Sequence, residues 1–181
     1  MEKTYELQVA GLKRTLPIIQ VAEDLAIASF VLLGDAEMTT QAAIALAKKL
    51  PTDIDYLVTA EAKGIPLLQE LARIMDFKTY IVARKSVKAY MDAPLEASVF
   101  SITTQKEQTL ILDGRDAALI AGKNVAIIDD VISTGESLQA LVTLVEKAGA
   151  KVIAQAAVLA EGDAAKREDI VFLEELPLFP R

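Results

Sequence analysis

The sequence contains no cysteine and no histidine among its 181 residues. Without cysteine there can be no disulfide and no thiolate metal site. Without histidine there can be no Ser/His or Cys/His catalytic pair and no histidine general base. Any chemistry that this protein performs must therefore use carboxylates, lysines, arginines, hydroxyl groups and the backbone.

Positive charge and long apolar runs are also scarce. The chain has 19 basic and 26 acidic residues, for a net charge of -7, so it repels polyanions and is not expected to bind nucleic acid. No apolar run is long enough to span a membrane, and the opening MEKTYELQVAGLK is too polar for a signal peptide. We therefore expect a cytoplasmic protein with no membrane partner, in which a local basic cluster could still bind a small phosphate.

The apolar content is sufficient for one substantial core, because 52% of the residues are hydrophobic. There is no internal repeat, low-complexity tract or Ser/Gly linker that would divide the chain. We therefore expect residues 1–181 to form a single domain.

Strand-like and helix-like segments alternate along the sequence. Helical spacing of apolar residues predicts helices at residues 35–50, 64–75 and 135–148, the first with Asp35 as its N-cap. Short apolar runs predict strands at residues 54–60, 79–83, 124–130 and 151–160, and a pair of strands around residues 98–112. This order indicates an α/β fold with a mostly parallel, twisted sheet flanked by helices, and ligands beyond the carboxyl ends of the strands.

The most informative segment is VAIIDDVISTGES, residues 125–137. A buried strand brings Asp129 and Asp130 to its carboxyl end, and a loop of small residues then leads into a helix. The loop can direct backbone N–H groups and hydroxyl groups at a phosphate on the positive end of that helix. The two carboxylates would repel a phosphate, so they suit a sugar diol or a magnesium-bound group.

Two other interpretations of this segment were weighed. The strand could end in an ordinary polar turn before a capped helix, but the Ser-Thr-Gly loop in a strand-loop-helix context favours phosphate binding. Response-regulator receiver domains also have paired aspartates at the end of a strand. They carry that pair near the start of the chain, however, whereas here only about fifty residues follow it.

Residues 125–137 resemble the motif by which type I phosphoribosyltransferases bind phosphoribosyl pyrophosphate (PRPP), and the closest likeness is to the adenine and xanthine (purine) enzymes. The segments TAEAKGIPL (residues 59–67) and ARKSVK (residues 83–88) resemble that family's pyrophosphate loop and basic segment. The resemblance covers roughly residues 40–160. It implies the type I fold, with a small hood or edge elements from residues 1–34 and 161–181.

The resemblance also implies roles for individual residues. The 5-phosphate and ribose would be bound by Asp129, Asp130, Val131, Ile132, Ser133, Thr134, Gly135, Glu136 and Ser137. Pyrophosphate would be bound by Ala62, Lys63, Gly64, Arg84, Lys85 and Lys88, with a non-proline cis peptide between Ala62 and Lys63. The catalytic residues would be Asp129, Asp130 and Lys88.

Further resemblances concern a mobile loop and the base pocket. The loop would contain Thr103, Thr104, Gln105, Lys106 and Glu107. Adenine enzymes usually have Glu-Tyr where Thr104 and Gln105 stand, and the Thr-Thr-Gln run is more like xanthine enzymes. The base pocket would contain Ile65, at a position where adenine enzymes often have an aromatic residue, together with Leu16 and Ile18.

The function implied is transfer of the phosphoribosyl group from PRPP to a purine, giving a nucleoside monophosphate and pyrophosphate. Magnesium would be held through PRPP and water near Asp129 and Asp130, with no direct protein ligand, and the enzyme would be a homodimer. The base is expected to be of the adenine or xanthine type, but its identity stays open among adenine, xanthine, guanine and others. Two other functions also remain open. One is a PRPP sensor of the same fold without transferase activity, and the other, ranked lower, is a pyrimidine or orotate enzyme.

Overall fold

A five-stranded parallel sheet forms the centre of the computed structural model, which describes residues 3–101 and 106–180. In spatial order its strands are β10 (Val171–Leu176), β9 (Lys151–Glu161), β8 (Asn124–Ile132), β4 (Tyr56–Ala60) and β5 (Ile81–Ala83). Every neighbouring pair is parallel. The carboxyl ends of β8, β4 and β5 therefore meet at one edge.

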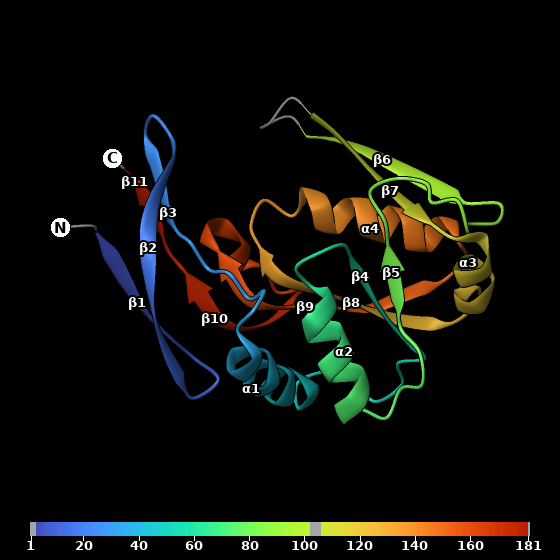
Figure 1. Ribbon diagram of the computed structural model, residues 1–181, viewed down its shortest axis with the longest axis horizontal. Helices are drawn as coiled ribbons and strands as arrows, with labels where there is room; N and C mark the ends of the chain where they lie inside the picture. The colour runs from blue at the N-terminus through green and yellow to red at the C-terminus, as the bar shows by residue number, and fades with distance from the viewer. Residues whose placement is uncertain (1–2, 102–105, 181) are drawn as a thin grey trace.

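Helices cover both faces of this sheet (Figure 1). On one face lie α1 (Ala36–Ala47) and α2 (Ile65–Ile74), and on the other lie α3 (Gly114–Ile120) and α4 (Glu136–Lys147). Asp35 caps α1 as predicted, because its Oδ1 accepts a hydrogen bond from the Met38 amide at 3.0 Å. The sequence did not predict α3, which is short and capped by Asp113. None of the described helices is long and apolar enough to cross a membrane.

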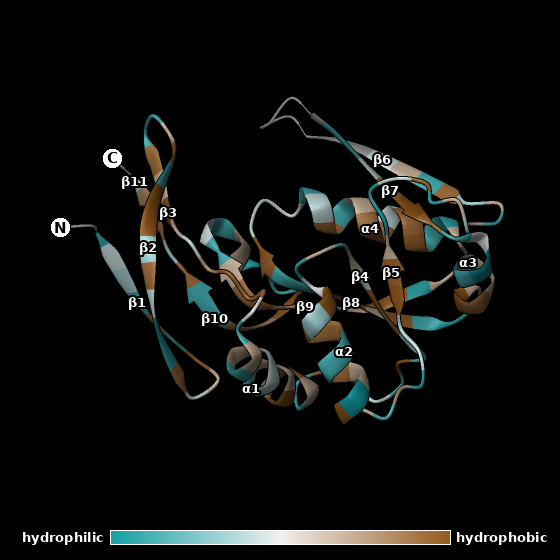
Figure 2. Ribbon diagram, viewed as in Figure 1, coloured by the Kyte–Doolittle hydropathy of each residue, from teal (hydrophilic) through white to brown (hydrophobic). Residues whose placement is uncertain are grey.

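Strand β8 shows why the sheet is buried on both faces. Ala126 and Ile128 point into the core beneath α1 and α2, whereas Val125 and Ile127 point into the core beneath α4. All four side chains are fully buried. A continuous apolar run is therefore required here, and the hydropathy colouring shows it along the central strands (Figure 2).

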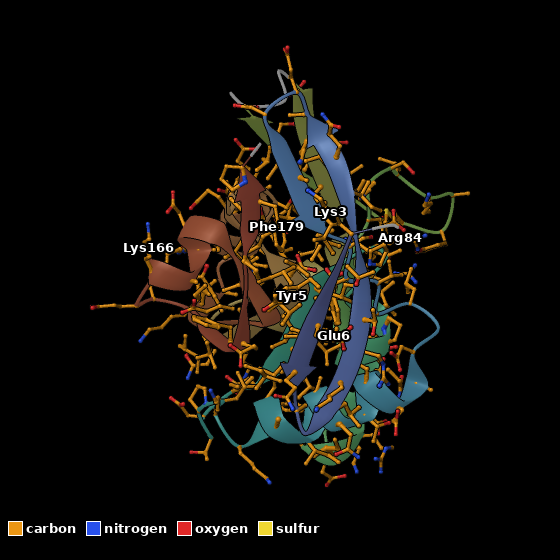
Figure 3. All side chains as sticks on the ribbon, turned by 90° about the vertical axis from the view of Figure 1, so that its left-hand side faces the viewer. Lys3, Tyr5, Glu6, Arg84, Lys166 and Phe179 are labelled. Atoms are coloured by element: carbon orange, nitrogen blue, oxygen red, sulfur yellow. The ribbon has the colours of Figure 1, made fainter. Side chains whose placement is uncertain are left out.

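The N-terminal segment forms a second sheet. Its antiparallel strands are β1 (Thr4–Val9), β2 (Leu12–Ala22), β3 (Leu25–Ala28) and the C-terminal β11 (Leu178–Pro180). Tyr5 on β1 and Phe179 on β11 contact edge to face, with ring centroids 5.8 Å apart (Figure 3). The two ends of the chain thus pack together, and the C-terminal tail also supplies β10 at the edge of the central sheet.

A hairpin of β6 (Leu95–Ser101) and β7 (Lys106–Leu112) packs against α4 (Figure 1). It is joined to the chain after β5 by two backbone hydrogen bonds of 2.7 Å between Arg84 and Ile111. A short 3-10 helix, η1 (Gly162–Lys166), links β9 to β10. Because β9 lies beside β8, this link runs near the carboxyl end of β8.

Candidate active site

A cavity of about 620 Å³ opens at the carboxyl ends of the central strands. Three segments line it: residues 60–63 after β4, residues 107–110 of β7, and residues 129–135 with Ser137 and Leu138 at the join of β8 and α4. Lys85, after β5, completes the lining. Ligands of open parallel sheets bind in this position, because loops from adjacent strands converge there.

Residues 133–135 form the loop between β8 and α4, and Glu136 and Ser137 begin the helix. Gly135 is the N-cap of α4 and has φ +82°, a left-handed conformation that glycine adopts without strain. Ser133, Thr134 and Ser137 are exposed around it, and the buried Leu138 anchors the first turn of the helix. The amide groups at the start of α4 and the three hydroxyl groups are donors of the kind that can bind an anion.

The acidic pair lies between this loop and the loop after β4. The Asp130 side chain is only 2% exposed, and its Oδ2 lies 3.3 Å from Lys63 Nζ. That oxygen accepts no hydrogen bond from the described residues, so Lys63 provides its compensating charge. Asp129 Oδ1 accepts a hydrogen bond of 2.8 Å from the Asp130 amide.

Burial, followed by the negative charge of Asp130, raises the pKa of the Asp129 carboxyl to about 7. The protonated form of this carboxyl is therefore more favoured than is usual for an aspartate. Binding of a cation or of hydroxyl donors beside Asp129 would favour its charged form. The two aspartates thus form a polar site that a ligand can complete.

The loop after β4 packs tightly on the sheet. Thr59 Oγ1 donates a buried hydrogen bond of 2.6 Å to the carbonyl oxygen of Ile128 on β8. A Cβ atom at Gly64 would collide with Thr59 Oγ1, so only glycine allows α2 to begin here. The non-proline cis peptide joins Glu61 and Ala62, one residue before the expected Ala62–Lys63 bond, which is trans.

Glu61 joins this loop to the basic segment after β5. Its carboxylate accepts hydrogen bonds from Arg84 Nε at 2.7 Å and from the Lys85 amide at 2.6 Å. Arg84 Nη1 also donates to the Tyr90 hydroxyl at 2.6 Å. The Lys85 amide and then the Arg84 guanidinium hold the pKa of Glu61 below its usual range, so the carboxylate is charged.

The basic residues therefore divide into two groups. Lys63 and Lys85 line the cavity, whereas the Arg84 guanidinium is held by Glu61 and Tyr90. Lys88 Nζ donates to Ser86 Oγ at 2.6 Å, and Lys88 does not line the cavity. In this conformation the two lysines carry the positive charge that a ligand would meet first.

The comparisons with known proteins agree with this geometry. Residues 33–177 match the family model of the phosphoribosyl transferase domain. The chain belongs to the phosphoribosyltransferase family. An adenine phosphoribosyltransferase from Thermoanaerobacter pseudethanolicus shares the fold, with a TM-score of 0.71 at 21% identity over 88% of this chain and 95% of that one. The predicted family and type I fold are thereby confirmed.

Two curated relatives of this phosphoribosyltransferase are named hypoxanthine/guanine phosphoribosyltransferase. The one from Methanococcus voltae is 34% identical over 137 residues, which are 76% of this chain and 69% of the relative. The one from a Methanocaldococcus species is 37% identical over 114 residues, 63% of this chain and 54% of the relative. The matched part thus spans between about half and seven-tenths of these relatives.

Two of the five residues expected in the mobile loop of the phosphoribosyltransferase are among the described residues. Thr103, Thr104 and Gln105 lie outside the described residues. Lys106 begins β7, and Glu107 is exposed and lines the cavity.

The three residues expected around the base do not line the cavity. Leu16 is 6% exposed, because β2 packs this side chain into the core beneath the N-terminal sheet. Ile18 on β2 and Ile65 at the start of α2 are half-buried. Within the PRPP motif itself, the Ile132 side chain is also in the core, so it could serve a ligand only through its backbone.

Sequence reasoning missed two polar residues of this phosphoribosyltransferase site. Glu61 had no assigned role, although it lies inside the segment that resembles the pyrophosphate loop. Gln108 also had no assigned role, yet its Oε1 accepts a hydrogen bond of 2.8 Å from Ser137 Oγ in the first turn of α4. The position of Glu61 directly after β4 could have indicated a site residue. The role of Gln108 could not be read from local sequence, because its partner Ser137 is 29 residues away.

Proposed function

We propose that this chain transfers the 5-phosphoribosyl group of PRPP to a purine base and releases pyrophosphate. One observation carries the proposal: residues 133–135 with Ser137, the Asp129–Asp130 pair and the two lysines Lys63 and Lys85 all line one cavity. A matching ligand needs anionic groups at two separate places and hydroxyl groups between them. PRPP has that arrangement.

In this proposal the chain works by positioning and electrostatics. The loop at α4 holds the 5-phosphate, Asp129 and Asp130 accept hydrogen bonds from the ribose hydroxyls, and Lys63 and Lys85 stabilise the negative charge of the leaving group. The bond between C1 and the pyrophosphate oxygen breaks, and its electron pair leaves with pyrophosphate. A ring nitrogen of the purine forms the new bond to C1 and loses its proton.

Magnesium fits this site as a shared ion. Among the described residues no group of three or more acidic side chains could hold a metal ion by itself. The Asp130 Oδ2 atom without a hydrogen bond and the Asp129 carboxyl could contact a hydrated ion that also binds ligand oxygens. Bound magnesium would neutralise charge on the pyrophosphate and diol oxygens.

We propose a 6-oxopurine, hypoxanthine or guanine, as the preferred base, because the relatives above 30% identity carry that name. The adenine and xanthine assignments from the sequence remain the alternatives. The solved adenine enzyme supports the fold alone, at 21% identity.

A homodimer is part of the same proposal. Val31 and Leu33, which follow β3, are 58% and 45% exposed, and β2 exposes Val21 at 54%. Apolar side chains exposed on neighbouring segments are suited to an interface between two copies. Sedimentation velocity of the purified protein should give twice the chain mass of 19.5 kDa, and a monomer at all concentrations would contradict it.

The test of function is pyrophosphate release from PRPP with magnesium and a panel of adenine, hypoxanthine, guanine, xanthine, uracil and orotate. We expect release with a purine only, and fastest with hypoxanthine or guanine. The Asp130→Asn variant is the matched control and should be inactive while still folded. Binding of PRPP without release for any base would instead identify a sensor.

A further inference from the structure

We propose that Arg167 is a positioning residue for the phosphate loop and supplies the positive charge that the loop lacks. This inference rests on the proposed 5-phosphate role of residues 133–137. That stretch contains no lysine or arginine and does contain the acidic Glu136. The described lysines that line the cavity, Lys63 and Lys85, follow β4 and β5 instead.

Arg167 reaches the loop from behind. It is the residue directly after η1, and its amide donates to the Ala164 carbonyl at 3.1 Å. A Cβ atom built on Gly135 would lie 2.8 Å from Arg167 Nη1. The guanidinium therefore packs directly against the residue whose left-handed conformation shapes the loop, and it occupies the space that a side chain at position 135 would need.

The orientation of this guanidinium is set by Asp169. Arg167 Nε and Nη2 donate to the two carboxylate oxygens of Asp169 at 2.9 and 2.7 Å. Such two-point pairing fixes the plane of the guanidinium. It leaves the Nη1 edge facing Gly135. The Arg167 side chain is 33% exposed, so water screens its charge only in part.

The preceding residue, Lys166 at the end of η1, has different surroundings. Lys166 projects into solvent at 81% exposure and pairs with the exposed Asp163 (Figure 3). Two adjacent basic residues thus have opposite surroundings, one in solvent and one against the phosphate loop. A basic side chain that only improved solubility would not need the orientation that Asp169 imposes.

Two effects on a bound phosphate follow. The packed guanidinium keeps the backbone around Gly135 in place, so the amide groups at the start of α4 stay directed at the phosphate. Its charge also lies behind the loop and attracts the phosphate dianion through the loop. Both effects concern the 5-phosphate and not the pyrophosphate, which would lie against Lys63 and Lys85.

The test is calorimetric titration of the full chain with ribose 5-phosphate and, separately, with magnesium pyrophosphate. We expect Arg167→Gln to weaken ribose 5-phosphate binding by roughly tenfold, the effect of about 1.4 kcal/mol, and to leave pyrophosphate binding unchanged. In steady state the KM for PRPP should rise by about the same factor while kcat stays within about twofold. Arg167→Lys, which keeps the charge, should recover part of the loss.

The matched control is Arg73→Gln, because Arg73 forms the same two-point pair with Glu70 on α2, away from the cavity. It should bind both ligands like the unmodified protein. Equal ribose 5-phosphate affinity in Arg167→Gln and the unmodified protein would overturn the inference, as would an Arg167→Lys variant no better than Arg167→Gln. If the unmodified protein bound neither ligand, the proposed function itself would fail.

Discussion

The two ends of the cavity are built for anions in different ways. At the α4 end the donors are backbone amides and small hydroxyl groups, with Arg167 behind Gly135. At the other end the donors are the lysine side chains of Lys63 and Lys85 on two separate loops, which Glu61 joins. The first end suits a phosphate that stays bound throughout the reaction, as proposed for the 5-phosphate. The second suits a leaving group that gains negative charge, as proposed for the pyrophosphate.

The largest effect is expected from Lys63→Ala. This change removes a cation from the pyrophosphate end and leaves the buried Asp130 carboxylate without its partner. A buried charge without a partner is strongly unfavourable, so the Asp130 side of the site is disturbed as well. Because both changes act on the proposed transition state, we expect kcat/KM to fall by about 300-fold. Lys78→Ala, which breaks an exposed pair with Asp76, is the control and should change little. A fall of less than threefold in Lys63→Ala would contradict the role.

A smaller effect is expected at the opposite end, from Gly135→Ala. Alanine is strained at φ +82°, and its Cβ would displace Arg167. We expect ribose 5-phosphate to bind about 30-fold more weakly, with pyrophosphate unaffected. Gly122→Ala is the matched control, because Gly122 also has positive φ, at 73°, but its Cβ would meet open space. If both variants lost the same affinity for ribose 5-phosphate, backbone strain alone would explain the loss and the contact with Arg167 would not contribute.

Glu61→Gln should affect only the pyrophosphate end. Glutamine keeps the length of the side chain but removes the charge that holds Arg84 and the Lys85 amide. We expect magnesium pyrophosphate to bind about tenfold more weakly and ribose 5-phosphate to bind normally. Glu70→Gln, which disrupts the Arg73 pair on α2, serves as the control. Equal weakening of both ligands in Glu61→Gln would mean that the two ends are not independent.

The last prediction concerns Asp129 and the stability of the fold, not ligand binding. Because the pKa of its carboxyl is about 7 in the fold and lower in the unfolded chain, folded Asp129 keeps a proton that the unfolded chain releases above about pH 4. Its contribution to the free energy of unfolding therefore falls as pH rises from about 4 to about 7. Asp129→Asn should remove that fall.

Urea unfolding of Asp129→Asn and the unmodified protein at pH 4.5 and pH 8 would measure this effect. From the two pKa values, we expect the variant to gain up to about 3 kcal/mol relative to the unmodified protein between the two pH values. Asp163→Asn is the control, since Asp163 forms an exposed pair with Lys166. If the free energies of unfolding of Asp129→Asn and the unmodified protein differed by the same amount at both pH values, the pKa of Asp129 would not be raised in the fold.

The parts of the molecule that could be predicted from the sequence depend on local patterns. The run before Asp129 had to be a buried strand, and Asp35 had the position of an N-cap. Gly135 marked the start of a helix. Each of these inferences needs only a few consecutive residues, because strand burial, capping and left-handed backbone are properties of short segments.

The parts that could not be predicted depend on contacts between distant segments. The pairing of β11 with β3, the Gln108 bond to Ser137 and the approach of Arg167 to Gly135 join residues far apart in the sequence. Arg84 illustrates the consequence. Its basic side chain predicted a phosphate contact, yet Glu61, 23 residues earlier, holds the guanidinium in this structure.

The most direct test of the two-ended cavity is a crystal structure of the protein soaked with magnesium and PRPP in the absence of a base. The account predicts the 5-phosphate on residues 133–137, the ribose hydroxyls on Asp129 and Asp130, and the pyrophosphate against Lys63 and Lys85. A cavity without PRPP, or a ligand bound with its phosphates in the opposite order, would contradict it.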